Sequence, residues 1–346
     1  MQKVIAYGIG RIYKKNEKQI REKYNIIGLM DKNAVSGTFY HGIPYLEMSK
    51  IGEVEYDGIL ITALYSRMDI VNDLRNLGVS DSNILFYFDE DTTNKSPVEV
   101  RLLEESMVVT KNGVSMYLED DNDNGLFNEI FCHNAYNFFP GVEGRPGIML
   151  DIGMNAGIAT LYFASMENIK AIYSFEPFKE TYDKAVKNIQ INSESVRGKI
   201  KTYNIGLSDR NYESFETGFS LDASTAMRID RNTCETSSSA SGTVSIRKFS
   251  DVFRKIHTES IAAEPQPMFI CKVDCEGSEY PIFKDMEESG ILKQIDLIIL
   301  ETHDGGEQYI LSLLRKYGYV YFSNTTERGL GMVYAVNIQH LTDENH

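Results

Sequence analysis

Short apolar stretches alternate with polar, helix-forming stretches along most of the chain, and this alternation predicts parallel strand–helix–strand units. In the first 88 residues, strands are predicted at residues 3–10, 25–31, 56–63 and 83–88. Helices are predicted between these strands at residues 11–24 and 66–78. We therefore expect a small α/β domain over residues 1–88.

The next part of the chain, residues 89–144, has a less regular pattern. Asn112 and Gly113 lie between alternating apolar residues, which is typical of a tight β-hairpin. Residues 124–139 are rich in aromatic side chains and predict a helix. This part is predicted to be a connecting hairpin and helix.

The third part, residues 145–340, returns to alternating strands and helices. Strands are predicted at residues 147–153, 171–177, 200–206, 268–274, 295–302, 319–324 and 331–337. The last two are joined by only residues 325–330, too short for a helical crossover, so they must run antiparallel. We expect a mostly parallel seven-stranded α/β sheet with an antiparallel last strand. Residues 232–242 are rich in serine and are predicted to form a mobile loop.

Composition narrows the possible functions. The 346 residues are 42% apolar, which is enough for a packed core. A formal charge of -15 argues against nucleic-acid binding, because such proteins need a basic face to neutralise phosphates. No secretory signal and no run of about 18 apolar residues is visible, so we expect no membrane span. Four cysteines in this length fit a reducing compartment, and we expect a cytoplasmic protein.

The first strand of the third part ends in residues suited to ligand binding, because ligands bind at the carboxyl ends of parallel strands. Gly153 permits a sharp turn and a close approach of a ligand. Gly157 opens a helix whose free N–H groups favour a carboxylate. Asp151 would repel a pyrophosphate but not an amino acid that carries both a carboxylate and an ammonium group. The alternative is a helix start without a ligand.

Glu176 follows Asp151 by 25 residues, at the end of the second strand of this part. At that offset an acidic side chain accepts hydrogen bonds from ribose hydroxyls. Pro177 and Phe178 could form an apolar wall for a base. The alternatives are a solvated strand end for Glu176 and core packing for Phe178. Together with the glycine turn, the spacing favours a ribose site.

The fourth and fifth strands of this part end in a group of ionisable residues: Lys272, Asp274, Glu276, Glu279, Glu301, His303 and Asp304. An acidic helix start would explain Glu276 and Glu279, because carboxylates are favoured there. It explains Asp274 and His303 less well. A cation held by Asp274, Glu276 and Asp304 is an alternative, but nothing in the spacing demands one, and no metal is predicted.

Several stretches of the third part together resemble the FkbM family of methyltransferases. They are "LDIGMNAG", "SFEP", "NIGLSD", "VSIRKFSDVF", "CKVDCEGSEYPIF" and "IILETH". The resemblance covers about residues 131–336, and residues 272–279 carry its most specific part. Met154 stands where the family usually has alanine.

The resemblance implies an S-adenosylmethionine-dependent O-methyltransferase that acts on a hydroxyl of a sugar, or of a sugar-containing or other secondary-metabolite acceptor. The methionine part of that cofactor carries the carboxylate and ammonium groups that the strand end favours. The resemblance implies these cofactor-binding residues: Asp151, Gly153, Asn155, Gly157, Glu176, Pro177, Phe178, Ser208 and Asp209.

The catalytic residues are expected to be His303, Asp274 and Lys272. A sugar hydroxyl is a weak acid, so a base must take its proton as the new bond forms. We expect His303 to be this base, with a pKa near 6 to 7 if unperturbed, and Asp274 to position the hydroxyl.

The N-terminal part carries a broken dinucleotide fingerprint. Gly8 and Gly10 match its first two glycines, Tyr13 replaces the third, and Asp31 follows at about the ribose offset. This part looks like a small Rossmann-like domain that binds a nucleotide or nucleotide sugar, or else a structural or dimerising domain. Two other functions stay open: an NAD-dependent sugar-modifying enzyme, for which we find no hydride-transfer site, and a non-catalytic scaffold. The acceptor, the hydroxyl and the oligomeric state are not predicted.

Overall fold

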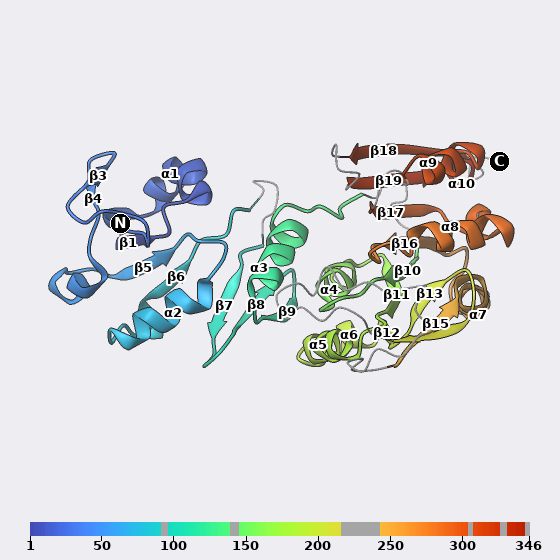
Figure 1. The fold of residues 1–346 in the computed structure, drawn as a ribbon, viewed down its shortest axis with the longest axis horizontal. Helices are drawn as coiled ribbons and strands as arrows, with labels where there is room; N and C mark the ends of the chain where they lie inside the picture. Colours follow the sequence, from blue (N-terminus) through green and yellow to red (C-terminus); the bar gives the residue numbers. More distant parts are fainter. Residues whose placement is uncertain (91–95, 139–144, 216–242, 304–306, 326–330, 343–346) are drawn as a thin grey trace. The chain divides into compact units, whose positions relative to one another are not determined.

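The computed structural model describes residues 1–90, 96–138, 145–215, 243–303, 307–325 and 331–342. The chain divides into two compact units, Met1–Ala135 and Tyr136–His346. Figure 1 shows the helices and strands of both units. Each unit is described by itself below.

The first unit contains a four-stranded parallel sheet in the order β2-β1-β5-β6. Its strands are β1 Lys3–Tyr7, β2 Asn25–Met30, β5 Gly58–Ile61 and β6 Ile84–Phe86. The helices and short elements around it are α1 Arg11–Lys23, β3 Phe39–Tyr40, β4 Ile43–Pro44, η1 Met48–Glu53, α2 Arg67–Asn76 and η2 Asp81–Asn83. Val4 and Ala6 pack in one core cluster and Ile5 and Tyr7 in another, so both faces of the sheet are covered.

The rest of the first unit is a three-stranded antiparallel sheet and a helix. Its elements are β7 Glu99–Leu102, β8 Met107–Lys111, β9 Val114–Leu118, α3 Asp121–Phe127 and the π-helix η3 Asn128–Cys132. Asn112 and Gly113 have φ values of 53° and 78°, the geometry of the predicted tight hairpin between β8 and β9. The helix begins earlier than residue 124 because the Asp120 side chain accepts the N–H of Asp123 and caps it.

The second unit is built on a seven-stranded sheet in the order β12-β11-β10-β16-β17-β19-β18. Its strands are β10 Gly147–Ile152, β11 Ile169–Phe175, β12 Ile200–Tyr203, β16 Met268–Val273, β17 Leu297–Thr302, β18 Tyr319–Thr325 and β19 Gly331–Asn337. The first five in that order are parallel, and β19 is antiparallel to both β17 and β18. The predicted mostly parallel seven-stranded sheet is confirmed.

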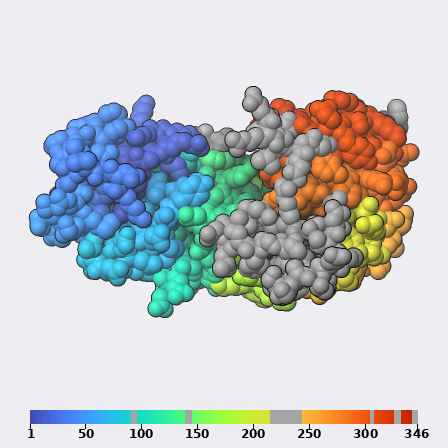
Figure 2. Space-filling model, viewed as in Figure 1, coloured from blue at the N-terminus to red at the C-terminus, as the bar shows by residue number. Residues whose placement is uncertain are grey.

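Helices separate the strands of the second unit. They are α4 Ile158–Ala164, α5 Lys179–Gln190, α6 Glu194–Arg197, α7 Phe249–Ala263, α8 Glu279–Glu288, η5 Ile291–Gln294, α9 Glu307–Lys316 and α10 Gln339–Thr342. Every residue of β10 and β16 is buried, as expected of central strands in a parallel sheet. The last strands and α9 form the red end of the surface in Figure 2. None of the described helices is long and apolar enough to cross a membrane.

A small second sheet of this unit was not expected from the sequence. Its strands are β13 Gly206–Ser208, β14 Tyr212–Phe215 and β15 Thr243–Lys248, in the order β13-β15-β14. These strands are short, and β14 and β15 are far apart in the sequence, so no local pattern indicates their pairing. The predicted serine-rich loop at 232–242 lies outside the described residues.

Candidate active site

The turn after β10 brings two strand ends together. Gly153 has a φ of +84°, and a Cβ built on it would lie 1.7 Å from the carbonyl oxygen of Asp274. Only glycine permits this contact between the turn after β10 and the chain that leaves β16. Gly157 also has a positive φ, +80°, and opens α4 with its built Cβ 3.2 Å from Ala185. The predicted glycine turn is therefore present and packs against the end of β16.

Glu176 joins this turn from the end of β11. Its carboxylate accepts the N–H of Asn155 at 2.9 Å and the N–H of Phe178 at 3.1 Å. The side chain of Asn204 fixes the same corner by donating to the carbonyl oxygens of Glu176 and Pro177. Burial raises the pKa of Glu176 to about 7, although both backbone N–H groups act to lower it.

Lys272 connects β10 and β16 from inside the protein. Its Nζ donates to the carbonyl oxygen of Gly153 at 2.6 Å and lies 3.3 Å from Asp151 and 3.4 Å from Asp274. Burial acts to lower the pKa of Lys272, but the charges of Asp151 and Asp274 outweigh burial and raise it well above its usual value. Lys272 is therefore a buried cation that holds the turn in place.

Asp151 is fully buried at the end of β10. Its Oδ2 accepts a hydrogen bond from the hydroxyl of Thr160 at 2.5 Å. Its Oδ1 has no hydrogen-bond donor among the described residues, although Lys272 lies near it. The ammonium group of Lys272, 3.3 Å away, compensates the charge of this buried oxygen.

His303 follows β17, and its ring is held by a buried carboxylate. Nδ1 donates to Oε1 of Glu279 at 2.9 Å, while Nε2 lies 3.7 Å from Glu276 and 4.0 Å from Glu301. Glu279 also accepts the N–H groups of Cys275 and Gly277, so the loop after β16 fixes its carboxylate.

The charges around His303 change its protonation. Burial acts to lower the pKa of His303, but the hydrogen bond to Glu279 and the charges of Glu279, Glu276 and Asp274 raise it to about 9. The pKa of His303 therefore lies above the range near 6 to 7 expected of an unperturbed histidine. At neutral pH the ring is protonated, and a protonated ring does not accept a proton from a hydroxyl.

Asp274, Glu301 and His303 come together at the ends of β16 and β17. One ligand-type atom from each lies within 4.8 Å of the others. Of the cation ligands considered from sequence, Asp274 belongs to this group, Glu276 lies beside His303, and Asp304 lies outside the described residues. The strand ends thus assemble the group of ionisable residues that the sequence placed there.

Three of the predicted cofactor-binding residues also have contacts of their own within the second unit. Phe178 is buried against Val244 and Ile246 of β15, which is the packing role considered as its alternative. Ser208 is the buried last residue of β13, and its hydroxyl lies 3.4 Å from the carboxylate of Asp209. Their contact with a cofactor stays a prediction.

Two tyrosines near the site were not found from the sequence. Tyr136 interacts electrostatically with Lys272 and stacks on Phe163 of α4, with ring centroids 6.0 Å apart. The hydroxyl of Tyr280 donates to the carbonyl oxygen of His303. Tyr280 follows Glu279 directly, so that motif could have indicated it, whereas no signal in the sequence singles out Tyr136.

The turn after β1, in the first unit, is closed by its own side chains. Asp31 accepts the N–H of Ile9 at 2.8 Å and the N–H of Asn33 at 3.0 Å. Gly8 has a φ of +95°, and a Cβ built on it would lie 2.9 Å from Ala63. Tyr13, at the position of the third glycine, is fully buried in the core.

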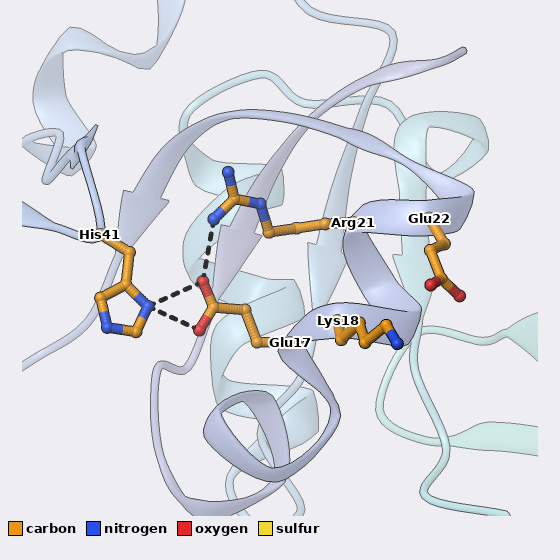
Figure 3. Close-up of a pocket in the computed structure, with 5 residues that line it drawn as sticks. All are labelled: Glu17, Lys18, Arg21, Glu22 and His41. Atoms are coloured by element: carbon orange, nitrogen blue, oxygen red, sulfur yellow. Dashed lines mark hydrogen bonds and ion pairs between the residues drawn. The ribbon is translucent and has the colours of Figure 1, made fainter.

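A surface hollow in the first unit offers no comparable arrangement. Figure 3 shows its lining residues, which are Glu17, Lys18, Arg21, Glu22 and His41. Glu17 accepts from Arg21 at 3.1 Å and from His41 at 2.9 Å, and both partners are exposed. The hollow contains surface ion pairs, and we assign no site to it.

Comparison with protein families identifies the second unit. Residues 151–321 match the model of the methyltransferase FkbM domain. This part of the chain is similar to the FkbM methyltransferase domain. The chain is an S-adenosylmethionine-dependent methyltransferase. Residues 1–85 match the model of the C2185-like N-terminal domain. The Rossmann-like nucleotide site expected in that part stays a prediction.

Solved methyltransferase structures are similar to the chain at low sequence identity. The methyltransferase FkbM from Methylobacillus flagellatus is 13% identical, with coverage of 96% of this chain and 90% of that one and a TM-score of 0.36. A human methyltransferase 10 domain containing protein is 11% identical over 61% and 80% of the chains, with a TM-score of 0.33. The O-methyltransferase TomG from Streptomyces achromogenes is 11% identical over 55% and 72%, with a TM-score of 0.31. No curated protein sequence matches the chain.

Proposed function

We propose that the FkbM-like domain transfers the methyl group of S-adenosylmethionine to a hydroxyl oxygen of a sugar or sugar-containing acceptor. The observation that carries this proposal is that the turn after β10 and the ionisable group after β16 and β17 lie next to each other at one edge of the sheet. The turn after β10 contacts the backbone of Asp274, and Asp274 belongs to the ionisable group with Glu301 and His303. A cofactor held at the turn therefore has its reacting end beside groups that can bind a hydroxyl.

The residues at the turn fit S-adenosylmethionine. Gly153 permits the close turn against Asp274, and Asp151, paired with Lys272, places a carboxylate at the same strand end. Glu176 accepts two backbone N–H groups, and each of its oxygens retains a second lone pair for a ribose hydroxyl. When bound, the cofactor supplies a methyl group on a sulfonium, which leaves as a neutral thioether.

On the acceptor side, Asp274 is the residue that positions the hydroxyl. Its side chain is 25% exposed, whereas its neighbour Lys272 is buried and holds the turn. The C–O bond forms as the S–C bond breaks, and the hydroxyl proton passes to a carboxylate beside Nε2 of His303. Glu276 and Glu301 are the carboxylates that lie there. His303 gives this group its fixed orientation through Glu279.

Nucleotide-sugar binding by the first unit has less support. Asp31, the residue that would contact a ribose, already accepts the N–H of Ile9 in its own turn. Tyr13 fills the core at the place where the fingerprint has a glycine. Both observations favour a structural role for this turn.

The proposal is tested with methyl-labelled S-adenosylmethionine and a panel of sugars, glycosides and nucleotide sugars. We expect label in a methyl ether, identified by mass spectrometry and NMR of the product. Glu176→Gln should weaken cofactor binding, while His41→Ala, a matched change in the first unit, should leave binding and transfer unchanged. Label on nitrogen or carbon, or no transfer to any hydroxyl by a protein that binds the cofactor, would contradict the proposal.

A further inference from the structure

We propose that Asp274, Glu301 and His303 form a binding site for one divalent cation, with Mn²⁺ as the best match. The role of this cation in the reaction rests on the proposed function, but the binding site itself does not. No cation ligand was predicted by the sequence pattern, so the site follows from how β16 and β17 place these three residues.

The spacing of the three ligand atoms suits a single ion. They lie within 4.8 Å of one another and come from the ends of two neighbouring strands. Ligand atoms bound at about 2.0–2.3 Å from one ion lie roughly 3–4.6 Å apart, depending on the angle between them. The three side chains therefore need only small adjustments to share one cation.

His303 is oriented as a metal-binding histidine. Ligating histidines usually donate their other ring N–H to a carboxylate, which fixes the ring and directs the free nitrogen at the metal. Here Nδ1 donates to Glu279, which is fully buried and held by the N–H groups of Cys275 and Gly277. The second nitrogen, Nε2, is thereby aimed at the carboxylates, and a cation bound there takes the place of the proton that the ring otherwise carries.

The surroundings of Nε2 give an independent reason for a ligand. The His303 side chain is only 5% exposed, and its Nε2 faces the carboxylates of Glu276 and Glu301. The nearest carboxylate oxygens, of Glu276 and Glu301, lie at 3.7 and 4.0 Å, beyond hydrogen-bond length. A buried polar nitrogen directed at oxygens of this separation leaves room for an ion between them.

The donor set selects the class of cation. Mg²⁺ and Ca²⁺ prefer oxygen ligands alone, whereas an imidazole with two carboxylates suits Mn²⁺, Fe²⁺ or Zn²⁺. Asp274 and Glu301 have side chains 25% and 37% exposed, so an ion bound there keeps open positions toward solvent. Open positions exclude a closed structural zinc site, and two carboxylates together with solvent oxygens suit Mn²⁺.

The open positions also define what the ion would do. An acceptor hydroxyl that occupies one of them becomes more acidic, because the cation stabilises the negative charge that develops on its oxygen. Glu276 lies beside His303 but outside the three ligands, so it is the carboxylate to which the proton passes. This assignment narrows the acceptor of the proton in the proposed reaction to one residue.

The site is tested with the full chain, stripped by a chelator and titrated with Mn²⁺ alone, by the loss of the free-Mn²⁺ electron paramagnetic resonance signal. We expect one bound ion per chain and higher affinity than for Mg²⁺. Glu301→Gln, at a partly exposed strand end, should weaken binding by at least about tenfold, and Glu279→Gln by about 10–100-fold. Glu288→Gln, on the exposed side of α8 with a side chain 63% exposed, is the matched control and should bind normally.

Two results would overturn the proposed cation site. Absence of bound Mn²⁺, or the same affinity in Glu301→Gln and in the unaltered protein, would contradict it. Thermal unfolding of each variant shows that it is folded, and Mn²⁺ should raise the melting temperature only where it binds. Mn²⁺ binding is measured without cofactor or acceptor. Methyl transfer to a hydroxyl by the metal-free protein would therefore overturn only the role of the cation in the reaction, and a bound ion without such transfer would contradict only the proposed function.

Discussion

The chain contains the same kind of turn twice. After β1 and after β10, a buried strand ends at a glycine with positive φ, Gly8 and Gly153 respectively. In each case an acid from the end of the next parallel strand, Asp31 or Glu176, accepts a backbone N–H of the turn. The two turns therefore satisfy their backbone groups in the same way, and their local sequences alone would not assign a ligand to one and not the other.

The difference lies in the neighbouring strands. Beside the turn after β10, the ends of β16 and β17 bring in Lys272, Glu279 and His303, all of them buried. Beside the turn after β1, β5 leads to Thr62, a neutral residue that bonds the carbonyl oxygens of Tyr7 and Gly8. Arg67 is also buried on that side and donates to the carbonyl oxygens of Ala63 and Tyr87. The difference is therefore the cluster of buried charges of both signs beside the turn after β10, which costs stability unless it is well paired and so indicates function. The predictions below separate the two turns.

The largest expected difference is in turnover, between variants of two histidines that each pair with a glutamate. His303→Ala should lower turnover by ~10²–10⁴ with little change in cofactor affinity, because it removes the group that organises the acceptor side. His41→Ala, which removes the surface pair with Glu17, should leave turnover unchanged. Steady-state kinetics and calorimetry test both, and near-normal turnover of His303→Ala would remove this residue from the mechanism.

Replacing the acid at each of the two turns should affect the affinity of the protein for the cofactor differently. Glu176→Ala removes the ribose acceptors, and hydrogen bonds to a charged group contribute about 1.5–3 kcal/mol each. Two such bonds correspond to a loss of roughly 10²-fold or more in affinity, measured by calorimetry. Asp31→Ala should destabilise the first unit and leave affinity unchanged. A change of affinity in Asp31→Ala would show that the first unit contributes to the cofactor site.

Replacing the glycine at each of the two turns should lower the free energy of unfolding by different amounts. Gly153→Ala combines an unfavourable φ with a Cβ 1.7 Å from a backbone oxygen, so we expect a loss of about 2–5 kcal/mol and of cofactor binding. Gly8→Ala meets Ala63 at 2.9 Å and should cost less, about 1–3 kcal/mol, with cofactor binding intact. Denaturant unfolding measures the costs. A larger loss of stability in Gly8→Ala than in Gly153→Ala would mean that the turn after β10 can accommodate a side chain more easily than its packing indicates.

The buried carboxyl group of Glu176 should make stability and cofactor affinity vary with pH in opposite directions. Its pKa in the folded protein, about 7, lies above the ordinary value of 4.5, so between these values the folded chain binds more protons. The free energy of unfolding should therefore fall as pH rises, by on the order of 1–3 kcal/mol. Cofactor affinity should rise with pH, because ionised Glu176 accepts both ribose hydroxyls. Glu176→Gln should abolish both trends, and their persistence would assign them to another group.

The smallest effect is expected when the first unit is removed. A fragment that begins at residue 136 should retain cofactor affinity within about twofold, because every proposed cofactor contact lies in the second unit. Calorimetry with the fragment and the full chain makes the comparison. A folded fragment that fails to bind would show that the two units share the cofactor site.

The sequence predicts what depends on local pattern. Apolar runs that end in glycine or acidic residues located the strands of the seven-stranded sheet, and with them the edge where Gly153, Glu176 and Asp274 meet. The parallel-sheet rule then placed the site before any contact was known. These features follow from burial and turn chemistry, which act on neighbouring residues.

The sequence does not predict what depends on distant residues. The pKa of His303 is raised by Glu279, which lies 24 residues away along the chain. Phe178 packs against β15, more than sixty residues later, so its role could not be separated from that of a cofactor wall. The three-residue strand β13 was missed for the same reason, because it is paired only through β15.

The position of β19 between β17 and β18 has a consequence for synthesis on the ribosome. Strand β17, which carries Glu301 and leads into His303, gains its second neighbour only when residues 331–337 have been made. Until then β17 is an open sheet edge, the kind of surface that pairs with other chains. The first unit emerges much earlier, and N-terminal domains generally fold first during synthesis. A nascent chain therefore has a finished N-terminal unit well before it has an active site, and a ribosome that pauses before residue 331 holds the methyltransferase domain in its most aggregation-prone form.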